Sequence, residues 1–510
     1  MKNYIYTALI TIISLSLFGQ DSLNMKKMGL VDGLGYDYND VWGYRHGSKE
    51  FAVIGSDSAI NIIDVSDCAN PTLVHQWVDG STVIWRDFKE YDDYIYAICD
   101  GNACQEGLQV INKNDFTHSQ SLAFFRKAHN IYIDKPAGRL YVAGANTNYQ
   151  GLIIYDIATD PANPIILKVL NFRDVTGNQS ENYYVHDVYV ENDTAYCSHG
   201  YPGFRIWDIT NPNNVSLIAE LENGTGGYNH SSWKHPNAPY MYVAEEVPIG
   251  KPMYVYDISD ITEPFETYNF KDPLEAPTYT NNRPHNPFVN KERLYISYYH
   301  DGIQVYDLED PELPNRVAYY DTYPDNNGNG YSSYHGAWGC YPFLPSGCIL
   351  ASDIEYGLHT LKLNLIPESK SSIPNYDFVI DNAAKGVVFV SFDDVYHRYK
   401  IDISGNLEVE NLIAPPTDKI EFVNSNLQFD SSGYGIIFKS TVGKYFRLKV
   451  DNFGIPYTIP VTLPSSNLSI TSGDLYFSQY KGGLILQNSN SDYYHITVNE
   501  LNSITSTLID

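Results

Sequence analysis

Histidine recurs at one position along the first three quarters of this chain, and the pattern could bring several imidazoles together. Seven short segments each start with a polar residue that precedes a β-rich run, and five of these residues are histidine. The seven positions are Asn39, Arg86, His129, His186, His230, His285 and His335. Neutral imidazole nitrogen is a good ligand for Zn, Fe, Mn and Cu ions. A fold that gathers these positions would therefore form a metal or ligand site.

Carboxylates and further histidines recur at a second position, after the next β-rich run of each unit. These residues are Asp100, His199, Glu245, Glu246, His300, Asp301, Asp353 and Glu355. In an antiparallel sheet the start of one strand and the end of the next lie at the same end of the sheet, so the histidines and the carboxylates would converge. The predicted metal ligands are His129, His186, His230 and His285 with Glu245 or Glu246. They suit a divalent ion such as Zn, Mn, Fe or Cu, whereas Ca would use mainly the oxygens.

Two structural explanations compete with this site. Histidines before the first strand of a propeller blade can simply tie a loop to a strand by hydrogen bonds. Aromatic residues near the histidines could line a ligand site or pack between blades. These aromatic residues are Trp233, Tyr298, Tyr299, Tyr334 and Trp338.

The elements that would position these residues are indicated by a repeat. Apolar runs that end in an acidic residue recur roughly every 44 to 55 residues, the spacing of four-stranded propeller blades. Clear copies are 60–65, 152–157, 204–209, 253–258 and 303–308, and degenerate copies are 108–112 and 358–362. No stretch has sustained helical periodicity, so the sheets must be antiparallel. The pattern predicts an all-β, seven-bladed β-propeller over residues 21–364, closed by an N-terminal strand within Met25–Gly33.

Charge narrows the range of partners. Acidic residues outnumber basic ones by 61 to 33, for a net charge of -28. This charge argues against nucleic acid and anionic membranes as partners, because phosphate contacts need clustered lysine and arginine. An extracellular protein, peptide or glycan remains open as a partner, although the charge could also serve solubility alone.

The N-terminus indicates export. Residues 1–20 contain a short basic segment, an apolar run and a small-residue exit, which is typical of a cleaved signal peptide. No later apolar stretch approaches the length of a membrane span, so the mature chain is expected to be secreted or at the cell surface. Six cysteines in an exported chain can be paired. Cys99 with Cys104 and Cys340 with Cys348 could each close a local loop, which leaves Cys68 and Cys197.

The ordered set of motifs resembles the LVIVD-repeat, choice-of-anchor B family of exported bacterial proteins. The matching segments are 85–89, 107–110, 128–131, 185–187, 228–233, 284–286, 299–308, 321–324 and 336–352. The resemblance covers residues 35–363 and implies a propeller on a secreted or cell-surface protein with interchangeable C-terminal anchors. It implies no reaction. The family has histidine at the positions of His129, His186, His230 and His285, whereas His335 stands where asparagine is more usual.

A change of pattern marks a second domain. Residues 365–376 have the composition of a linker, and residues 377–510 are β-rich. Three similar units, around 399–403, 446–450 and 494–498, recur in this region. Because three blades are too few to close a ring, we expect a small β-sandwich or an irregular β-domain.

Three functions fit these features. The first is a binding or scaffold module with a ligand or metal at the channel mouth. The second is a metal-dependent enzyme, a hydrolase or oxidoreductase, in which Glu245 or Glu246 acts as a general base. The third is a structural propeller. The sequence has no nucleophile elbow, Walker loop, dinucleotide fingerprint or zinc-protease motif, which disfavours the commoner enzyme classes.

Overall fold

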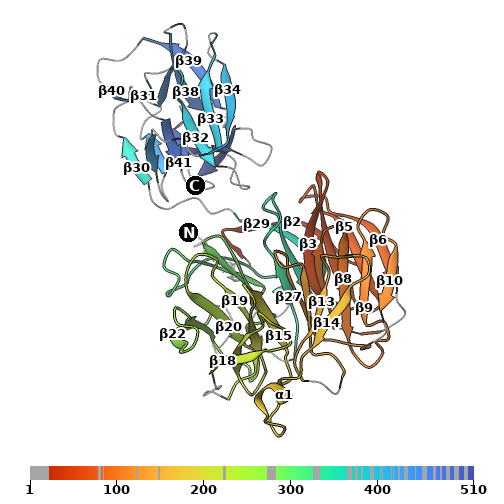
Figure 1. Cartoon of the computed structure of the whole chain (residues 1–510). Coiled ribbons are helices and arrows are strands. Elements are labelled where there is room, and N and C mark those ends of the chain that lie inside the picture. The colour runs from red at the N-terminus through yellow and green to blue at the C-terminus, as the bar shows by residue number, and fades with distance from the viewer. Residues whose placement is uncertain are drawn as a thin grey trace, which may run out of the picture. The chain divides into compact units, whose positions relative to one another are not determined.

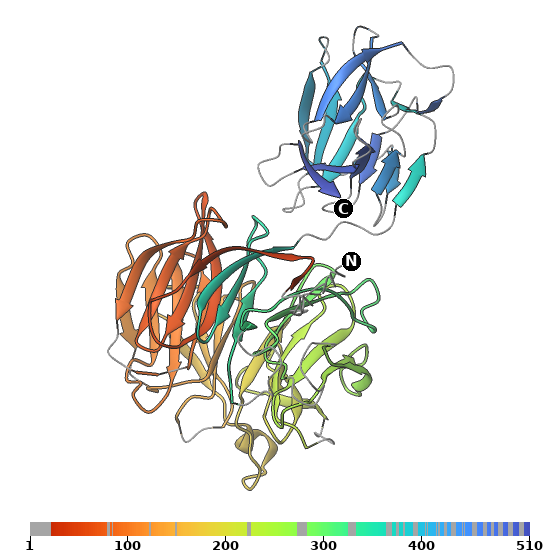
Figure 2. The same ribbon diagram turned by 180° about the vertical axis from the view of Figure 1, so that it is seen from behind.

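The chain folds as two compact β-units in a computed structural model (Figures 1 and 2). The structure describes residues 22–509 apart from short gaps, the longest of which are 273–282 and 325–332. The first unit holds residues 1–341 and 350–361, and the second holds residues 342–349 and 362–510. Among the described residues only α1 (Phe172–Thr176) is an α-helix. No helix in this part of the chain is long and apolar enough to cross a membrane. The predicted signal peptide, residues 1–20, lies outside the described residues.

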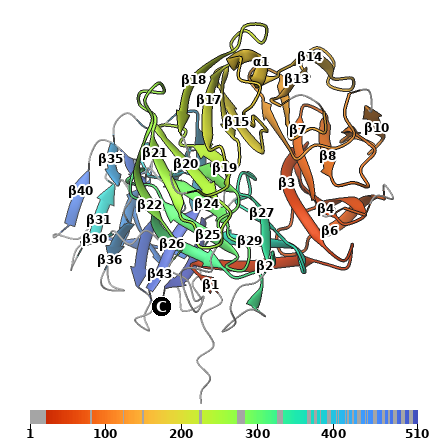
Figure 3. The ribbon, with the colours of Figure 1, turned by 90° about the horizontal axis from the view of Figure 1, so that it is seen from below.

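The first unit is a β-propeller. Its described strands form seven antiparallel sheets, and Figure 3 shows them fanned around a centre. Five sheets consist of four consecutive strands each. They are β3 (Tyr38–His46), β4 (Lys49–Ser56), β5 (Ala59–Asp64) and β6 (Thr72–Val78); β7 (Trp85–Tyr91), β8 (Tyr94–Asp100), β9 (Leu108–Asn112) and β10 (His118–Ser121); β11 (Asn130–Asp134), β12 (Arg139–Ala143), β13 (Ile153–Asp156) and β14 (Ile165–Val169); β15 (Asp187–Glu191), β16 (Thr194–Ser198), β17 (Phe204–Asp208) and β18 (Ser216–Leu221); and β19 (Asn229–Lys234), β20 (Tyr240–Glu245), β21 (Met253–Asp257) and β22 (Phe265–Phe270).

The last two sheets of the propeller each include a strand from the N-terminus. The first joins β1 (Ser22–Leu23) to β23 (Pro287–Asn290), β24 (Arg293–Ser297), β25 (Ile303–Asp307) and β26 (Asn315–Tyr320). The second joins β2 (Met25–Val31) to β27 (Ala337–Tyr341), β28 (Ile349–Asp353) and β29 (Gly357–Leu363). The β2 strand is the outer strand beside β29, so residues from the two ends of this unit share one sheet.

The innermost strands follow one another in a closed ring. Contacts run from β3 to β7, β11, β15, β19 and β23, and then through β24 and β27 back to β3. Side chains between neighbouring sheets form the core. In one such core, Phe172 and Trp207 stack with ring centroids 3.9 Å apart and are fully buried. Burial of such large apolar side chains contributes about 1.5–3 kcal/mol each, so the blades are held together mainly by their faces.

The acidic residue that ends each repeated apolar run has a local structural role. Asp64, Asp156, Asp208, Asp257 and Asp307 each accept a hydrogen bond from the backbone N–H two residues further on, at 2.7–3.0 Å. Such Asx turns end a strand and reverse the chain. In the same five sheets the ladder between the third and fourth strands shifts register near this point. The repeat found in the sequence is therefore the signature of the turn between these strands.

The cysteines only partly follow the predicted pairing. Cys99 and Cys104 form a disulfide, as expected. The prediction for Cys340 is wrong, because Cys340 is a free, buried thiol while Cys348 is disulfide-bonded. Cys68 is also disulfide-bonded, and Cys197 is free and buried. Sequence proximity alone therefore misassigned Cys348.

The second unit is β-rich, as predicted, and contains three five-stranded sheets among its described residues. Of the two forms expected for it, the small β-sandwich is wrong, because a sandwich has two sheets. The sheets are β30 (Lys370–Ile373), β36 (Asn426–Phe429), β42 (Leu484–Gln487), β43 (Tyr493–Val498) and β44 (Ile504–Ile509); β40 (Asn467–Ile470), β31 (Asp377–Ile380), β37 (Ile436–Lys439), β38 (Tyr445–Val450) and β39 (Pro456–Val461); and β35 (Lys419–Phe422), β41 (Asp474–Phe477), β32 (Val387–Val390), β33 (Tyr396–Ile401) and β34 (Leu407–Leu412). Because β30 lies within 365–376, the segment predicted as a linker also contributes a strand.

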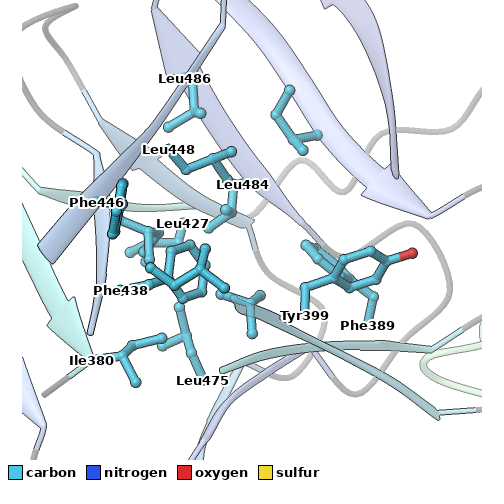
Figure 4. Packing of buried hydrophobic residues seen from close by; sticks show 14 of the residues in the cluster. Ile380, Phe389, Tyr399, Leu427, Phe438, Phe446, Leu448, Leu475, Leu484 and Leu486 are labelled. Carbon is cyan, nitrogen blue, oxygen red and sulfur yellow. The ribbon is translucent and has the colours of Figure 1, made fainter. Parts of the chain in front are cut away.

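Each sheet of the second unit takes strands from all three sequence repeats. In every sheet, one short strand from each of two repeats pairs in parallel and leads to three antiparallel strands of the third repeat. Buried residues from all three repeats meet in one core, shown in Figure 4, where Phe389, Phe438 and Leu486 occupy corresponding places. No single repeat forms one of these sheets by itself, so the three repeats depend on one another for strand pairing and for the core.

Candidate metal centre at the propeller axis

Four of the predicted histidines lie together where the innermost strands begin. His129 and His186 come directly before β11 and β15, His230 lies in β19, and His285 comes just before β23. The backbone N–H groups of His129, His186 and His285 donate to Ala143, Ser198 and Ser297, which end the neighbouring strands, at 2.8–3.0 Å. This shared hydrogen bond gives histidines from different blades an equivalent position. Their side chains therefore face one space, and we call these four residues the histidine cluster.

A glycine makes room for the first member of the cluster. Gly144 has a φ of 67°, and a Cβ atom at this position would lie 2.5 Å from the Cβ of His129. Only glycine adopts this backbone conformation readily and leaves the required space.

The imidazole rings follow one another closely around the axis. Ring centroids lie 4.0 Å apart from His129 to His186, 4.4 Å from His186 to His230, and 4.4 Å from His230 to His285. His186, His230 and His285 are buried, and His129 is half-buried. Ligand atoms within 4.8 Å of one another come from His129, His186 and His230 in one group and from His230, Glu246 and His285 in another. Both groups have the donors that transition-metal ions prefer.

Hydrogen bonds fix the tautomers of two cluster members. The Nδ1 atom of His129 lies 2.9 Å from Asp100 Oδ2, and the Nδ1 atom of His285 lies 2.5 Å from the carbonyl oxygen of Trp338. Because a carboxylate or carbonyl oxygen can only accept, each Nδ1 carries a proton, and Nε2 is the nitrogen through which the neutral ring would coordinate. Histidine ligands of metal ions usually have such a partner on the other nitrogen.

The remaining two histidines present buried nitrogen atoms that have no hydrogen-bond partner. His186 Nδ1 lies 3.1 Å from the hydroxyl of Tyr228, but its Nε2 has no partner. His230 Nδ1 is likewise without a partner. Leaving a buried polar atom unsatisfied costs about 1–3 kcal/mol. A bound cation would remove that cost, so the donor set fits a metal ion better than a purely structural role.

Protonation of the buried histidines at neutral pH does not offer an alternative to metal binding. Burial, followed by the nearby histidines, lowers the pKa of His186 far below its usual value, and burial with His129 lowers that of His230 to about 3. The pKa of His285 is also lowered, mainly by burial. Neutral imidazole is the form that coordinates metal ions, so these rings are ready to bind a cation without first losing a proton.

The two predicted glutamates have different surroundings. Glu246 belongs to the second ligand group, its Oε2 lies 4.0 Å from His230 Nε2, and its Oε1 accepts a hydrogen bond from Tyr299 at 2.6 Å. Glu245 is also buried but belongs to neither group, and its Oε2 lies 3.9 Å from the amine of Lys251. The structure thus brings Glu246, rather than Glu245, to the histidine cluster.

Other residues of the predicted funnel lie apart from the cluster. His335 pairs with Glu355 and stacks on Tyr323, with ring centroids 5.4 Å apart. His199 is buried and bonds the backbone oxygen of Tyr184 through Nδ1. Both histidines have the hydrogen-bonding and packing roles considered for propeller histidines, and neither belongs to a ligand group.

A second polar layer lines the same channel, and its residues were not among the predicted metal ligands. Asp40, Asp87 and Asp187 lie here, and the amine of Lys89 is 2.6 Å from Asp87 Oδ1. Burial and then Asp87 raise the pKa of Asp187 to about 8 and that of Asp40 well above its usual value. The available signal was the residue that follows each recurring position, since three of those seven residues are aspartate.

The fold and the cluster define the class of protein as a β-propeller with a histidine-lined axial site. Neither protein-family models nor curated proteins match the chain. Among solved structures, it is similar to the β-propeller domain of Cps50 (Swd1) from Myceliophteria thermophila, with 11% identity and a TM-score of 0.46 over 66% of this chain and 98% of that one. It is also similar to the computationally designed Ika8 protein, with 8% identity and a TM-score of 0.41 over 66% of this chain and 99% of that one.

Proposed function

We propose that this protein is a secreted or cell-surface binding module of the LVIVD-repeat, choice-of-anchor B type, with a divalent metal ion held by the histidine cluster. The observation that carries the proposal is the set of buried nitrogens without partners. His186 Nε2 and His230 Nδ1 lack hydrogen bonds, while His129 and His285 have their Nδ1 atoms occupied and their Nε2 atoms free to coordinate. Three imidazoles, or two imidazoles with Glu246, suit Zn, Fe, Mn or Cu.

Tyrosines beside the cluster support a role in binding a partner. Tyr201 is 61% exposed, and its ring centroid lies 5.1 Å from that of Tyr228, whose hydroxyl contacts His186. Tyr334 is 41% exposed, and its ring centroid lies 5.2 Å from that of Tyr299, whose hydroxyl donates to Glu246. Tyrosine combines an apolar ring with a polar tip and is enriched at binding interfaces. We propose that an extracellular protein, peptide or glycan contacts these rings above the metal.

Elemental analysis tests the proposal. The full chain is purified without a chelator or a polyhistidine tag, reconstituted with Zn, Mn, Fe, Cu or Ca, and freed of loosely bound ions. We expect a stoichiometric transition metal in the wild type, its loss in His230→Ala, and its retention in His335→Ala, the matched control from another blade. Equal metal contents in all three proteins, or no metal in any of them, would contradict the proposal.

A further inference from the structure

We propose that the histidine cluster holds two metal ions rather than one, and that they share His230. This inference rests on the proposed metal-binding function. The two groups of ligand atoms have only His230 in common: one adds His129 and His186, and the other adds Glu246 and His285. Each group alone has the three protein ligands that are usual for an open metal site.

The arrangement of the rings disfavours a single ion bound by all four histidines. Two ligand nitrogens on the same zinc ion lie at most about 4 Å apart, because each Zn–N bond is about 2.0–2.1 Å long. The ring centroids of the cluster follow one another in a row from His129 through His186 and His230 to His285. His129 and His285 stand at opposite ends of this row, and no ligand group among the described residues contains both. Two adjacent positions use all the ligands without bringing the ends together.

His230 is the member of the cluster that can serve both positions. The Nδ1 atoms of His129, His186 and His285 are engaged by Asp100, Tyr228 and Trp338. His230 instead has a buried Nδ1 without a hydrogen-bond partner, and its Nε2 lies 4.0 Å from Oε2 of Glu246. An imidazole that coordinates one ion through each nitrogen has no N–H. Binding of the second ion would therefore release the remaining ring proton of His230 to solvent.

The surrounding charge is suited to two dications. Glu246 lies within the cluster, and Asp100 bonds His129. Asp40, Asp87 and Asp187 line the same channel together with Arg86 and Lys89. Burial and Asp87 raise the pKa of Asp187 to about 8 and that of Asp40 well above its usual value. A cation at the cluster would favour the ionised form of these carboxyl groups.

The number of ions bound by the full chain distinguishes the possibilities. The protein is loaded with Co²⁺ or Zn²⁺ and dialysed against a weak chelator that removes ions bound to surface carboxylates. Its metal-to-protein ratio is then measured. We expect about two ions in the wild type and in the control His335→Ala, about one in His129→Ala and in His285→Ala, and fewer than one in His230→Ala. The conservative variants His129→Gln and His285→Gln, with thermal melts of every protein, ensure that a loss of metal is not a loss of folding.

The outcomes separate this inference from the proposed function. A wild-type ratio of one that falls to zero in His230→Ala would overturn the two-ion inference and leave the metal-binding function intact. Loss of both ions in His129→Gln while the protein stays folded would also overturn the existence of two separable positions. A wild-type ratio of zero would overturn both proposals.

Discussion

The two units of this protein use β-repeats of similar length in different ways. Among the described strands of the propeller, five sheets consist of four consecutive strands, and only β1 and β2 come from a distant part of the sequence. In the C-terminal unit, every sheet combines short parallel strands from two repeats with three antiparallel strands of the third. The propeller blades are thus nearly independent in strand pairing and depend on one another through their faces, whereas the C-terminal repeats depend on one another through backbone hydrogen bonds as well.

The largest expected effect follows from this exchange of strands. Truncation after residue 462 removes β40 to β44, and these strands belong to all three sheets of the C-terminal unit. We expect the whole unit to lose its protection, because the remaining repeats lack partners and part of the shared core. Limited proteolysis with mass spectrometry of the truncated chain should show an intact propeller and no protected fragment from 370–461. A stable fragment from that region would show that the repeats do not depend on one another.

The matching change in the propeller should have a smaller effect. Deletion of residues 21–33 removes β1 and β2, and β2 supplies the outer strand of the sheet that contains β27 to β29. Met25 is buried, so both core contacts and strand hydrogen bonds are lost. We expect the melting temperature of the propeller to fall by several degrees, since each kcal/mol of lost stability shifts it by roughly 2–4 °C in domains of 150–250 residues and by less in larger ones. An unchanged melting temperature would show that the N-terminal strand does not hold the ring closed.

The smallest expected effect concerns acid stability and a histidine outside the cluster. Burial lowers the pKa of His199 to about 3, whereas the unfolded chain takes up this proton near pH 6.5. Between these values the unfolded state binds more protons, so stability is present above pH 6.5 and is lost as the pH falls. The contribution is on the order of 2 kcal/mol by pH 5, because each pH unit changes it by about 1.4 kcal/mol.

Thermal melts across this pH range test the contribution of His199. The melting temperature of His199→Asn should fall less than that of the wild type between pH 7 and pH 4. Parallel declines in the two proteins would rule out titration of this buried imidazole as a source of acid sensitivity.

Much of the propeller could be predicted because its information is local. The recurring apolar run and its final aspartate encode a strand and an Asx turn, and each blade repeats them. The same repeats placed His129, His186, His230 and His285 at equivalent positions, which the structure gathers at the axis. Which of Glu245 and Glu246 joins the histidines depends on which side chain points toward the axis at the end of β20. The sequence pattern does not determine that orientation.

The parts that could not be predicted depend on contacts between distant segments. The spacing of the repeats in the sequence does not show that β30, β36 and β42, which come from three different repeats, pair in one sheet. The hydrogen-bond acceptor for His285 Nδ1 is the backbone oxygen of Trp338, and a backbone oxygen cannot be recognised from residue type. Cys348 illustrates the same limit, since its nearest cysteine in the sequence, Cys340, is a free thiol.

Anomalous diffraction would test the metal site most directly. Crystals of the full chain loaded with Co²⁺ or Zn²⁺ would be measured at the absorption edge of the metal. We expect anomalous peaks beside His230, within coordination distance of ring nitrogens from His129 and His186 or of His285 and Glu246. Peaks found only at surface carboxylates, with the histidine cluster free of metal, would contradict the assignment of the propeller axis as a metal centre.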